Sequence, residues 1–434
     1  MSKSPRIAVI GLGYVGLPLA VALARKFATT GFDINEKRVA ELKTGIDRTG
    51  EVDKPDLAAS RLALSFRTDD IRGHDVYIVT VPTPVDERNR PDLGAVRAAC
   101  RTVGKVMGKG AIVVFESTVY PGVTEDICGP ELEVASGLAA GSDFFLGYSP
   151  ERINPGDREH TVNRITKVVA GQTPEVTKTL ADVYGAVTTG GVFIARNIKT
   201  AEAAKVIENA QRDINIAFIN EVTMIFERLG VSIYDVLAAS ATKWNFLNFS
   251  PGLVGGHCIG VDPFYLAHVA QEHGHHPEII LAGRRINDGM GPYAARKIAD
   301  RLKELRPGYT GRPSGAALRV LVLGLTFKEN VPDLRNSKVI DLVTTLAERN
   351  CKVDVHDALA DPHEAKEEYG IDLLADLDSA TGYDCLLGAV PHAAYARLGA
   401  DAFRRMVAPG GLIADLKGMW RNQPVPQGLH VWRL

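Results

Sequence analysis

The feature that most constrains the fold is the segment RIAVIGLGYVGLPLAVALARKFATTGFDIN, which covers residues 6–35. A β-branched run leads into GLGYVG at residues 11–16, an apolar helical pattern follows, and a second short strand closes on Asp33. Glycines let the backbone approach a pyrophosphate, and the N-terminus of a helix offers free N–H groups and a positive dipole. This order of elements predicts a βαβ unit that binds a dinucleotide.

The acid that ends this unit indicates which dinucleotide is bound. Asp33 can accept hydrogen bonds from a ribose diol, and its charge repels a 2′-phosphate, so NAD is favoured over NADP. The alternative is a glycine-rich turn that merely packs a helix on a strand. The residues predicted to bind the cofactor here are Gly11, Gly13, Tyr14, Val15, Gly16, Asp33 and Arg38.

Further α/β alternation follows along the chain. VYIVTVPTP (76–84) and AIVVFESTVYPG (111–122) are predicted to be buried strands that run into turns. Open α/β sheets bind ligands at the carboxyl ends of their strands, which places four side chains toward the cofactor. These are Thr83, Glu116, Ser117 and Thr118. Their alternative role is capping of the next helix.

The segment FFLGYSPERINPG (144–156) reads as a strand followed by a loop bounded by proline and glycine. That loop carries Glu151 and Arg152, for which a solvated surface pair is the alternative. From Lys199 to about Leu229 a long stretch without proline has apolar residues at helical spacing. It predicts a helical spine between two α/β domains and a dimer surface.

Two polar residues of this predicted helix stand four positions apart. Lys205 and Asn209 therefore share one helix face, either as functional groups or as an exposed polar stripe.

The βαβ pattern of the first residues recurs near the end of the chain. A turn-rich segment at 306–316 is interpreted as a linker. Residues 317–357 then show the same order of elements as residues 6–35: a strand (Val320 to Leu323), a glycine turn, a helix, a second strand and an acid. The first turn here is about ten residues longer and carries Lys328 and Arg335. A longer basic loop suits a phosphate ligand other than a dinucleotide, so two nucleotides are expected on one chain.

Composition limits the number of domains and the kinds of partner that the chain can have. The chain has 434 residues, enough for two or three domains, and a net charge of −2 without a long run of like charge. Neither nucleic acid nor a membrane is expected as a partner, and the protein is predicted to be cytoplasmic. The five cysteines are widely spaced without a CxxC pair, so neither a disulfide framework nor a metal site is predicted.

One cysteine stands on a glycine-rich turn, in GLVGGHCIGVDPFYL (252–266). Gly255 and Gly256 would permit close approach of the backbone to a ligand, and Asp262 follows four residues after Cys258. In a nicotinamide enzyme, a cysteine can attack an aldehyde to give a thiohemiacetal, whose oxidation gives a thioester that water releases as an acid. Two oxidation steps are then expected. The alternative is an ordinary buried thiol.

Seven motifs in family order give the chain a resemblance that spans nearly its whole length. They are GLGYVGLP (11–18), VPTP (81–84), ESTVYPG (116–122), SPERINPG (149–156), EAAKVIENA (202–210), GGHCIGVDPFYL (255–266) and GLTFKENVPDLRNS (324–337). The chain resembles the UDP-glucose/GDP-mannose dehydrogenase family. KWNFLNFSPGLVGGHCIGVDPFYL and HHPEIILAGRRIND most resemble its bacterial branch of Vi-antigen capsule type, which oxidises UDP-N-acetylhexosamines.

The resemblance implies a role for each matching residue. Cys258 is implied to be the nucleophile, Lys205 and Asn209 to stabilise negative charge on the C6 oxygen, and Glu151 to activate the hydrolytic water. Asp262 would assist alcohol deprotonation with Lys205, and Thr118 would order the water. The implied contacts of the UDP, the sugar or the cofactor involve Arg152, His257, Arg284, Asn287, Lys328 and Arg335.

The family fold is α/β, with two Rossmann-like doubly wound domains joined by a long central helix and a helical dimerisation segment. For this chain it implies an NAD domain at 1–197, a central helical domain at 198–305 and a UDP-sugar domain at 316–434, in a homodimer or higher oligomer. The expected reaction is NAD-dependent oxidation of UDP-N-acetylglucosamine at C6 for surface polysaccharide biosynthesis. UDP-N-acetylgalactosamine or UDP-glucose oxidation and a non-catalytic sugar-nucleotide binding protein are the alternatives.

The sequence departs from the UDP-glucose enzymes at His257, where they usually have serine. This histidine could lie near the C2 substituent of the sugar, tune the thiol, or simply hydrogen-bond within its loop.

Overall fold

The structure is a computed structural model that describes residues 4–152, 163–305 and 317–434. The predicted linker at 306–316 and residues 153–156 of the loop after Glu151 lie outside the described residues. The chain divides into two compact units, one of Met1–Asn209 with Phe264–His276 and one of Ala210–Pro263 with Pro277–Leu434.

The first unit is built on an eight-stranded sheet in the order β3-β2-β1-β4-β5-β6-β7-β8. All neighbouring strands are parallel except β6 and β7. The strands are β1 (Arg6–Ile10), β2 (Ala28–Phe32), β3 (Ala63–Ser65), β4 (Val76–Val79), β5 (Ile112–Phe115), β6 (Phe145–Tyr148), β7 (Lys167–Gly171) and β8 (Val192–Ile194). The chain order reverses between β1 and β4, which makes their carboxyl ends the switch point where a doubly wound sheet binds its ligand.

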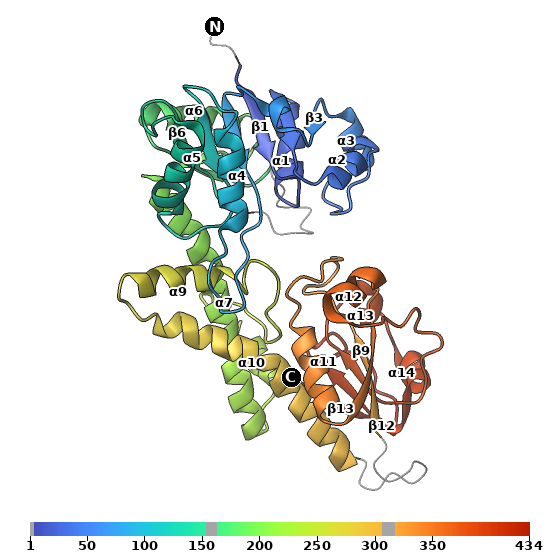
Figure 1. Cartoon of the computed structure of the whole chain (residues 1–434). Coiled ribbons are helices and arrows are strands. Elements are labelled where there is room, and N and C mark those ends of the chain that lie inside the picture. The colour runs from blue at the N-terminus through green and yellow to red at the C-terminus, as the bar shows by residue number, and fades with distance from the viewer. Residues whose placement is uncertain (1–3, 153–162, 306–316) are drawn as a thin grey trace. The chain divides into compact units, whose positions relative to one another are not determined.

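Helices connect the parallel strands of this sheet (Figure 1). They are α1 (Gly16–Ala24), α2 (Glu36–Lys43), α3 (Lys54–Ala59), α4 (Gly94–Gly104), α5 (Gly129–Ser136) and α6 (Pro174–Gly185), with short turns η1 (Thr68–Ile71) and η2 (Val123–Cys128). The apolar runs of β1, β4 and β5 are buried on both faces, as expected where helices cover both sides of a sheet.

The predicted long helix is present as α7 (Ile198–Leu229), which continues from the first unit into the second. In the described ranges, three further helices follow it before the second sheet, namely α8 (Ile233–Ser240), α9 (Asp262–Glu272) and α10 (Glu278–Leu305). α10 packs against α11 (Val339–Glu348) in the second unit, where Gly291 allows close approach because a Cβ there would lie 3.1 Å from the carbonyl oxygen of Lys338.

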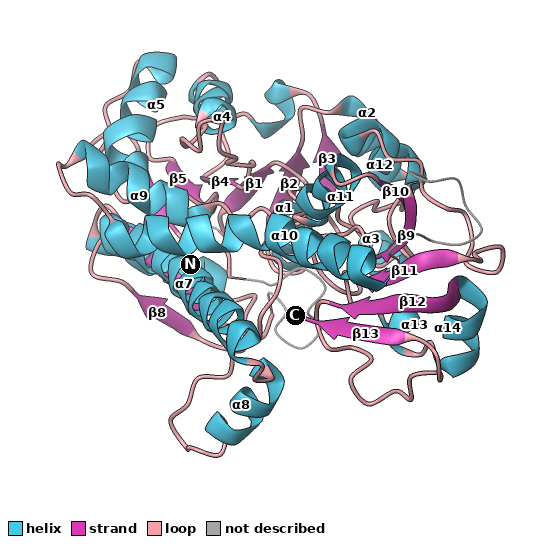
Figure 2. Cartoon of the chain, turned by 90° about the horizontal axis from the view of Figure 1, so that it is seen from below, coloured by secondary structure: helices cyan, strands magenta, loops and turns pink. Residues whose placement is uncertain are grey.

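The second unit holds a five-stranded, fully parallel sheet in the order β10-β9-β11-β12-β13 (Figure 2). Its strands are β9 (Leu318–Leu323), β10 (Cys351–His356), β11 (Tyr383–Gly388), β12 (Val407–Asp415) and β13 (His430–Arg433), and its other helices are α12 (Pro362–Tyr369), α13 (Ala393–Ala396) and α14 (Ala400–Met406). The order reverses between β9 and β11, so this sheet has a switch point of its own.

The central strand β9 shows why a strand of the second sheet is a continuous apolar run in the sequence. Val320 and Val322 join a core with residues of α10 and α11, whereas Leu321 and Leu323 join a core on the other face with Phe403 of α14.

The predicted fold class, α/β with two Rossmann-like doubly wound domains and a long helix, is confirmed. The predicted domain limits stay predictions. Across the described ranges, no helix is long and apolar enough to cross a membrane.

Candidate active site

The first turn of the first sheet is short and depends on two of its glycines. β1 ends at Ile10 and α1 begins at Gly16, so only residues 11–15 connect them. Gly11 has a φ of +96°, and a Cβ on Gly16 would lie 1.9 Å from the carbonyl oxygen of Gly11. A Cβ on Gly13, in contrast, would meet no described atom within 4 Å. Packing therefore requires glycine at 16 but leaves open space beside Gly13, as the approach of a pyrophosphate demands.

Asp33 and Arg38 brace this turn. The carboxylate of Asp33 accepts a hydrogen bond from the Leu12 N–H at 2.8 Å, and Arg38 donates from Nε and Nη2 to the Leu12 carbonyl. Arg38 also pairs with buried Asp47 at 2.7 Å. The Nη1 atom of Arg38 is buried without a hydrogen-bond partner among the described residues, so the guanidinium keeps a donor that a bound nucleotide could use.

The pKa of Asp47 reflects this bracing. Burial by itself raises the pKa of the Asp47 carboxyl, but hydrogen bonds from Thr49, Arg38 and the backbone outweigh burial and lower it overall. Asp47 therefore stays ionised beside Arg38.

The other predicted cofactor side chains follow β4 and β5 at the same edge of the sheet. Tyr265 of α9 donates to the carbonyl oxygens of Thr83 and Pro84 and so holds the turn after β4. Ser117 donates to the Val81 carbonyl at 2.6 Å, and Thr118, the next residue, is half-buried. Thr83 and Thr118 thus lie after adjacent strands, where the sequence predicted them.

Glu116 has a different surrounding from the one predicted. Its carboxylate accepts a hydrogen bond from the Tyr184 hydroxyl at 2.5 Å and pairs with the Lys167 ammonium at 2.9 Å. Lys167 is fully buried and also lies 3.5 Å from Glu151. Burial raises the pKa of Glu116, and Glu116 and Glu151 together raise that of Lys167 against the opposing effect of burial. Glu116 is thus an internal ion-pair partner that fixes Lys167.

Glu151 is held from two sides. Besides Lys167, its other carboxylate oxygen accepts the backbone N–H of Arg152 at 2.6 Å. The Arg152 side chain turns to Glu208 of α7 at 2.8 Å. Glu151 is 6% exposed, so the predicted hydrolytic carboxylate is a buried, positioned group.

α7 presents the predicted pair Lys205 and Asn209 one helical turn apart, each 7% exposed. One turn earlier, buried Glu202 accepts the N–H groups of Gly122 and Thr124 at 2.6 and 2.9 Å. Burial raises the pKa of Glu202 to about 7, although the hydrogen bonds to this carboxylate oppose the shift. Glu202 therefore anchors the ESTVYPG turn to α7.

The glycines before Cys258 correct one expectation. A Cβ on Gly255 would lie 2.5 Å from the Asn336 carbonyl oxygen, and a Cβ on Gly256 would lie 2.7 Å from the ring of Phe327. Asn336 and Gly256 also exchange two hydrogen bonds. The atoms that approach these glycines belong to the loop after β9, and glycine is needed at both positions for packing within the chain.

Cys258 itself is partly exposed, whereas the other four cysteines, all in the described ranges, are buried. The Cys258 carbonyl accepts the N–H of Asp262, the first residue of α9. Asp262 is 1% exposed. The Cys258 Sγ lies 3.9 Å from Nδ1 of His257, and Nε2 of that ring lies 2.8 Å from Nη2 of Arg335. The structure therefore brings three predicted residues together with Asp262.

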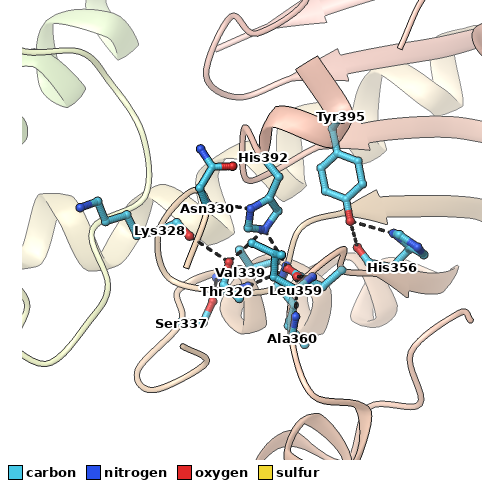
Figure 3. Close-up of polar contacts among 12 residues, drawn as sticks. Thr326, Lys328, Asn330, Ser337, Val339, His356, Leu359, Ala360, His392 and Tyr395 are labelled. Atoms are coloured by element: carbon cyan, nitrogen blue, oxygen red, sulfur yellow. Dashed lines mark hydrogen bonds and ion pairs between the residues drawn. The ribbon is translucent and has the colours of Figure 1, made fainter. Parts of the chain in front are cut away.

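The first turn of the second sheet is a loop of residues 324–338, between β9 and α11. The acid that ends β10, Asp357, accepts the N–H groups of Leu325 and Thr326 at 2.6 and 3.1 Å. His392 lies between this point and the loop: Nε2 is 3.1 Å from both Thr326 Oγ1 and Asp357, and Nδ1 accepts the Asn330 N–H (Figure 3).

The Thr326 hydroxyl in turn donates to the Lys328 carbonyl at 3.0 Å (Figure 3). Lys328 is half-buried beside this cluster. The long loop is therefore an ordered platform for its basic residues.

Arg284 and Asn287 serve the packing of α10 on α7 within the second unit. Arg284 is 2% exposed and pairs with Asp213 at 2.6 Å, and Asn287 donates to Asp213 and contacts Asn220. Asn220 in turn exchanges hydrogen bonds with Gly252, at the start of the cysteine loop. A substrate contact of Arg284 stays a prediction.

Three family models together match most of the chain. Residues 5–188 match the NAD binding domain of the UDP-glucose/GDP-mannose dehydrogenase family, 199–289 its central domain and 321–422 its UDP binding domain. The chain belongs to this family.

Similar proteins agree with that assignment. Protein CapL of Staphylococcus aureus is 53% identical over 99% of each chain. The UDP-N-acetyl-D-glucosamine 6-dehydrogenase of Pseudomonas aeruginosa is 52% identical over 96% of this chain and 97% of its own length. Among solved structures, the UDP-D-ManNAc dehydrogenase of Pyrococcus horikoshii superposes with a TM-score of 0.87 at 28% identity and covers 98% of each chain.

As a member of this dehydrogenase family, the chain uses NAD, and its own residues fit that cofactor. The open space at Gly13, the free donor on Arg38 and the position of Asp33 all lie at the turn after β1. The match to the UDP binding domain covers the whole loop at 324–338, in agreement with a nucleotide-sugar ligand for the second sheet.

Sequence reasoning missed several polar residues that hold the site. Lys167, Tyr184 and His392 belong to none of the quoted motifs, and Glu202 and Asp333 lie inside two of them, EAAKVIENA and GLTFKENVPDLRNS, without a predicted role. For Lys167 a signal existed, because a lysine opens the otherwise apolar strand KVVAG and a buried cation needs an acidic partner. For the others the partner is more than 30 residues away or the residue type is common on surfaces.

Proposed function

We propose that this protein oxidises UDP-N-acetylglucosamine at C6 to UDP-N-acetylglucosaminuronic acid, with two NAD per sugar, for surface polysaccharide biosynthesis. The observation that carries the proposal is the 52% identity to a UDP-N-acetyl-D-glucosamine 6-dehydrogenase over nearly the full length of both chains. The partly exposed thiol of Cys258 supports it, because a second oxidation at the same carbon needs a nucleophile that holds the aldehyde.

The proposed reaction is RCH2OH + H2O + 2 NAD+ → RCOO− + 2 NADH + 3 H+, where R is the remainder of the nucleotide sugar. NAD, when bound, accepts the hydride in each of the two oxidations. Between them the Cys258 thiolate forms a C–S bond with the C6 aldehyde, giving a thiohemiacetal that becomes a thioester. Water then breaks the C–S bond and returns the thiolate.

We assign the remaining steps as the family resemblance implies. Lys205 and Asn209 stabilise negative charge on the C6 oxygen, and Asp262 assists Lys205 in alcohol deprotonation. Glu151, with Thr118, directs the water to the thioester. The fixed position of Glu151 beside Lys167 supports this role, since an immobilised carboxylate orients a water better than a solvated one.

The test is to count NADH per sugar consumed with UDP-N-acetylglucosamine, UDP-N-acetylgalactosamine and UDP-glucose in parallel. About two NADH per sugar are expected, with UDP-N-acetylglucosamine preferred. Cys258→Ser should lose acid production while it still binds NAD. Cys351→Ala, which changes a buried cysteine at the start of β10, is the control and should retain activity. Acid production by Cys258→Ser would overturn the nucleophile assignment.

Other sugars remain competing substrates in this test. The solved structure of a UDP-D-ManNAc dehydrogenase shares the fold at 28% identity, which makes UDP-N-acetylmannosamine a useful fourth substrate. A clear preference for a sugar other than UDP-N-acetylglucosamine would overturn the substrate assignment and leave the chemistry standing.

We also propose that the protein forms a homodimer through α7 and acts in the cytoplasm, where NAD and nucleotide sugars are available. Phe218, Ile225 and Leu229 lie on one face of α7 and are 59%, 48% and 66% exposed in the single chain. A row of large exposed apolar side chains on one helix favours association. Light scattering during gel filtration should give twice the chain mass, and Phe218→Glu should reduce it.

A further inference from the structure

His257 has a specific contact with the sulfur that the proposed reaction uses. Nδ1 of the ring lies 3.9 Å from Sγ of Cys258, and the opposite nitrogen, Nε2, lies 2.8 Å from Nη2 of Arg335. The ring therefore bridges a guanidinium and a thiol.

The chemistry of arginine decides where the proton of this imidazole resides. A guanidinium has only donors, so Nε2 of His257 must be the acceptor of that hydrogen bond. A neutral imidazole carries one N–H, which is then on Nδ1 and faces the sulfur. The tautomer follows from the contact with Arg335.

Arg335 is itself held in place. Its Nε and Nη2 donate to the two carboxylate oxygens of Asp333 at 3.0 and 2.7 Å, a two-point pairing that fixes the plane of the guanidinium. Asp333 is 4% exposed, and although burial raises its pKa, the hydrogen bonds and charge of Arg335 outweigh burial and lower it. Asp333 thus stays ionised and keeps Arg335 directed at His257.

The loops that carry these residues are fixed to each other. Asn336 and Gly256 exchange two hydrogen bonds, and the ring of Phe327 lies 5.9 Å from that of His257 between centroids. The imidazole therefore has little freedom to turn away from either neighbour.

We propose that His257 donates a hydrogen bond from its Nδ1–H to the Cys258 thiolate, and that Arg335, fixed by Asp333, is the positioning residue that imposes this tautomer. A hydrogen bond to the charged form of a group favours that form, so the thiol ionises at lower pH and releases its proton to water. The catalytic use of this thiolate rests on the proposed function. His257 does not act as the base, because its Nδ1 already carries a proton.

Two other acidic residues lie near this cluster and bear on its pH dependence, and one of them, Asp262, bonds to the Cys258 carbonyl through its backbone N–H. Asp262 is buried four residues after Cys258, and Glu364 of α12 interacts electrostatically with Asp333 and Arg335. Burial raises the pKa of Glu364, with further contributions from the carboxylates of Glu368, Asp333 and Asp361. Both acids are present in the wild type and in the variants, so a comparison of the midpoints isolates the effect of the histidine on the thiol.

The test is the rate at which iodoacetamide alkylates Cys258 between pH 5.5 and 10 without substrate, followed by mass spectrometry of its peptide. The other four cysteines are buried, which favours selective labelling. The wild-type midpoint should lie at least one unit below the value of about 8.5 for an ordinary thiol. In His257→Leu the midpoint should rise by a unit or more, and in His257→Asn, whose amide N–H can occupy the Nδ1 position, by less.

The arginine is tested in the same way. Arg335→Met should raise the midpoint because the ring is free to move its proton to Nε2, whereas Arg335→Lys, which keeps a donor, should stay near the wild type. His363→Leu changes a histidine of α12 that is 89% exposed, and serves as the control with an unchanged midpoint.

An unchanged midpoint in His257→Leu would overturn the proposal, and an unchanged midpoint in Arg335→Met would overturn the role of Arg335. Should His257→Leu fail to fold, the two Arg335 variants decide the question. The thiol measurement needs no substrate. A wild-type midpoint that depends on His257, together with acid production by Cys258→Ser, would therefore refute the proposed function and leave this inference standing.

Discussion

In both sheets an acid stabilises the turn after the first strand, but the two turns are built differently. Each sheet has an acid at the end of its second strand that accepts N–H groups from the first turn, Asp33 from Leu12 and Asp357 from Leu325 and Thr326. In the first sheet the turn is residues 11–15, and in the second it is residues 324–338.

The lengths dictate what stabilises each turn. The short turn closes by backbone contact, so Gly16 must lack a side chain. The long loop has room for side chains and is held by buried polar groups, with His392 between Thr326 and Asp357. The short turn therefore offers a ligand the open space beside Gly13, while the long loop supplies side chains such as Arg335 to its surroundings.

The largest effect is expected where the short turn depends on backbone contact. Gly16→Ala places a Cβ 1.9 Å from the Gly11 carbonyl oxygen and should cost more than about 4 kcal/mol of unfolding free energy. Gly13→Ala, which meets open space, should cost less than about 1 kcal/mol but weaken NAD binding at least tenfold. Urea unfolding and NAD titration measure both. Equal loss of stability in the two variants would contradict this division of roles.

The second prediction compares the two acids. Asp357→Asn should cost about 3 kcal/mol, because an amide N–H2 would face backbone donors that the carboxylate now accepts, whereas Asp33→Asn should cost about 1 kcal/mol.

The same comparison has a pH dependence. Burial raises the pKa of Asp357, but hydrogen bonds with His392 and the backbone hold it well below its ordinary value of 3.8. Its stabilisation is therefore present above about pH 4 and is lost as the pH falls further. The difference between wild type and Asp357→Asn should shrink in acid; a constant difference would argue against an ionised Asp357.

Glu202 also anchors a turn, but its pKa is shifted the opposite way. Burial raises its pKa from 4.5 to about 7, so its contribution to stability is full below pH 4.5 and diminishes as the pH rises through 7. Between pH 5.5 and 8 the wild type should lose about 2 kcal/mol relative to Glu202→Gln, which does not titrate. Chemical unfolding at both pH values measures this, with exposed Glu175→Gln as control.

The smallest effect is expected inside the long loop. Thr326→Val removes the hydroxyl that donates to the Lys328 carbonyl and should cost about 1 kcal/mol, whereas Thr326→Ser should be near neutral. Hydrogen exchange of the amides at 324–338 should accelerate in Thr326→Val, and exchange at 11–15 should not change. Faster exchange in both turns would mean that the variant destabilises the whole chain.

Much of the fold was predictable because its signals are local. The run that ends on Gly11, the helix from 198 to 229 and the ten extra residues after β9 can all be recognised without knowing what packs against them. The antiparallel pairing of β6 with β7 was not predictable, because no local pattern distinguishes it from the parallel pairings around it.

The site was predictable only in part. The resemblance indicated Glu151, Lys205, Asn209 and Cys258, but not how each is held. Gly255 and Gly256 illustrate the difference: their small size was evident, but the sequence could not show that Asn336 and Phe327, rather than a ligand, approach them.

The sequence alone determined two βαβ units, a preference for NAD and one cysteine on a glycine-rich turn, because each of these is written in a few adjacent residues. The tertiary structure decided which polar groups meet: Lys167 with Glu116 and Glu151, His392 with Asp357, and Arg335 with His257, 78 positions before it. A buried polar group must find a hydrogen-bond partner wherever the packing of distant elements provides one, and that packing depends on the whole chain.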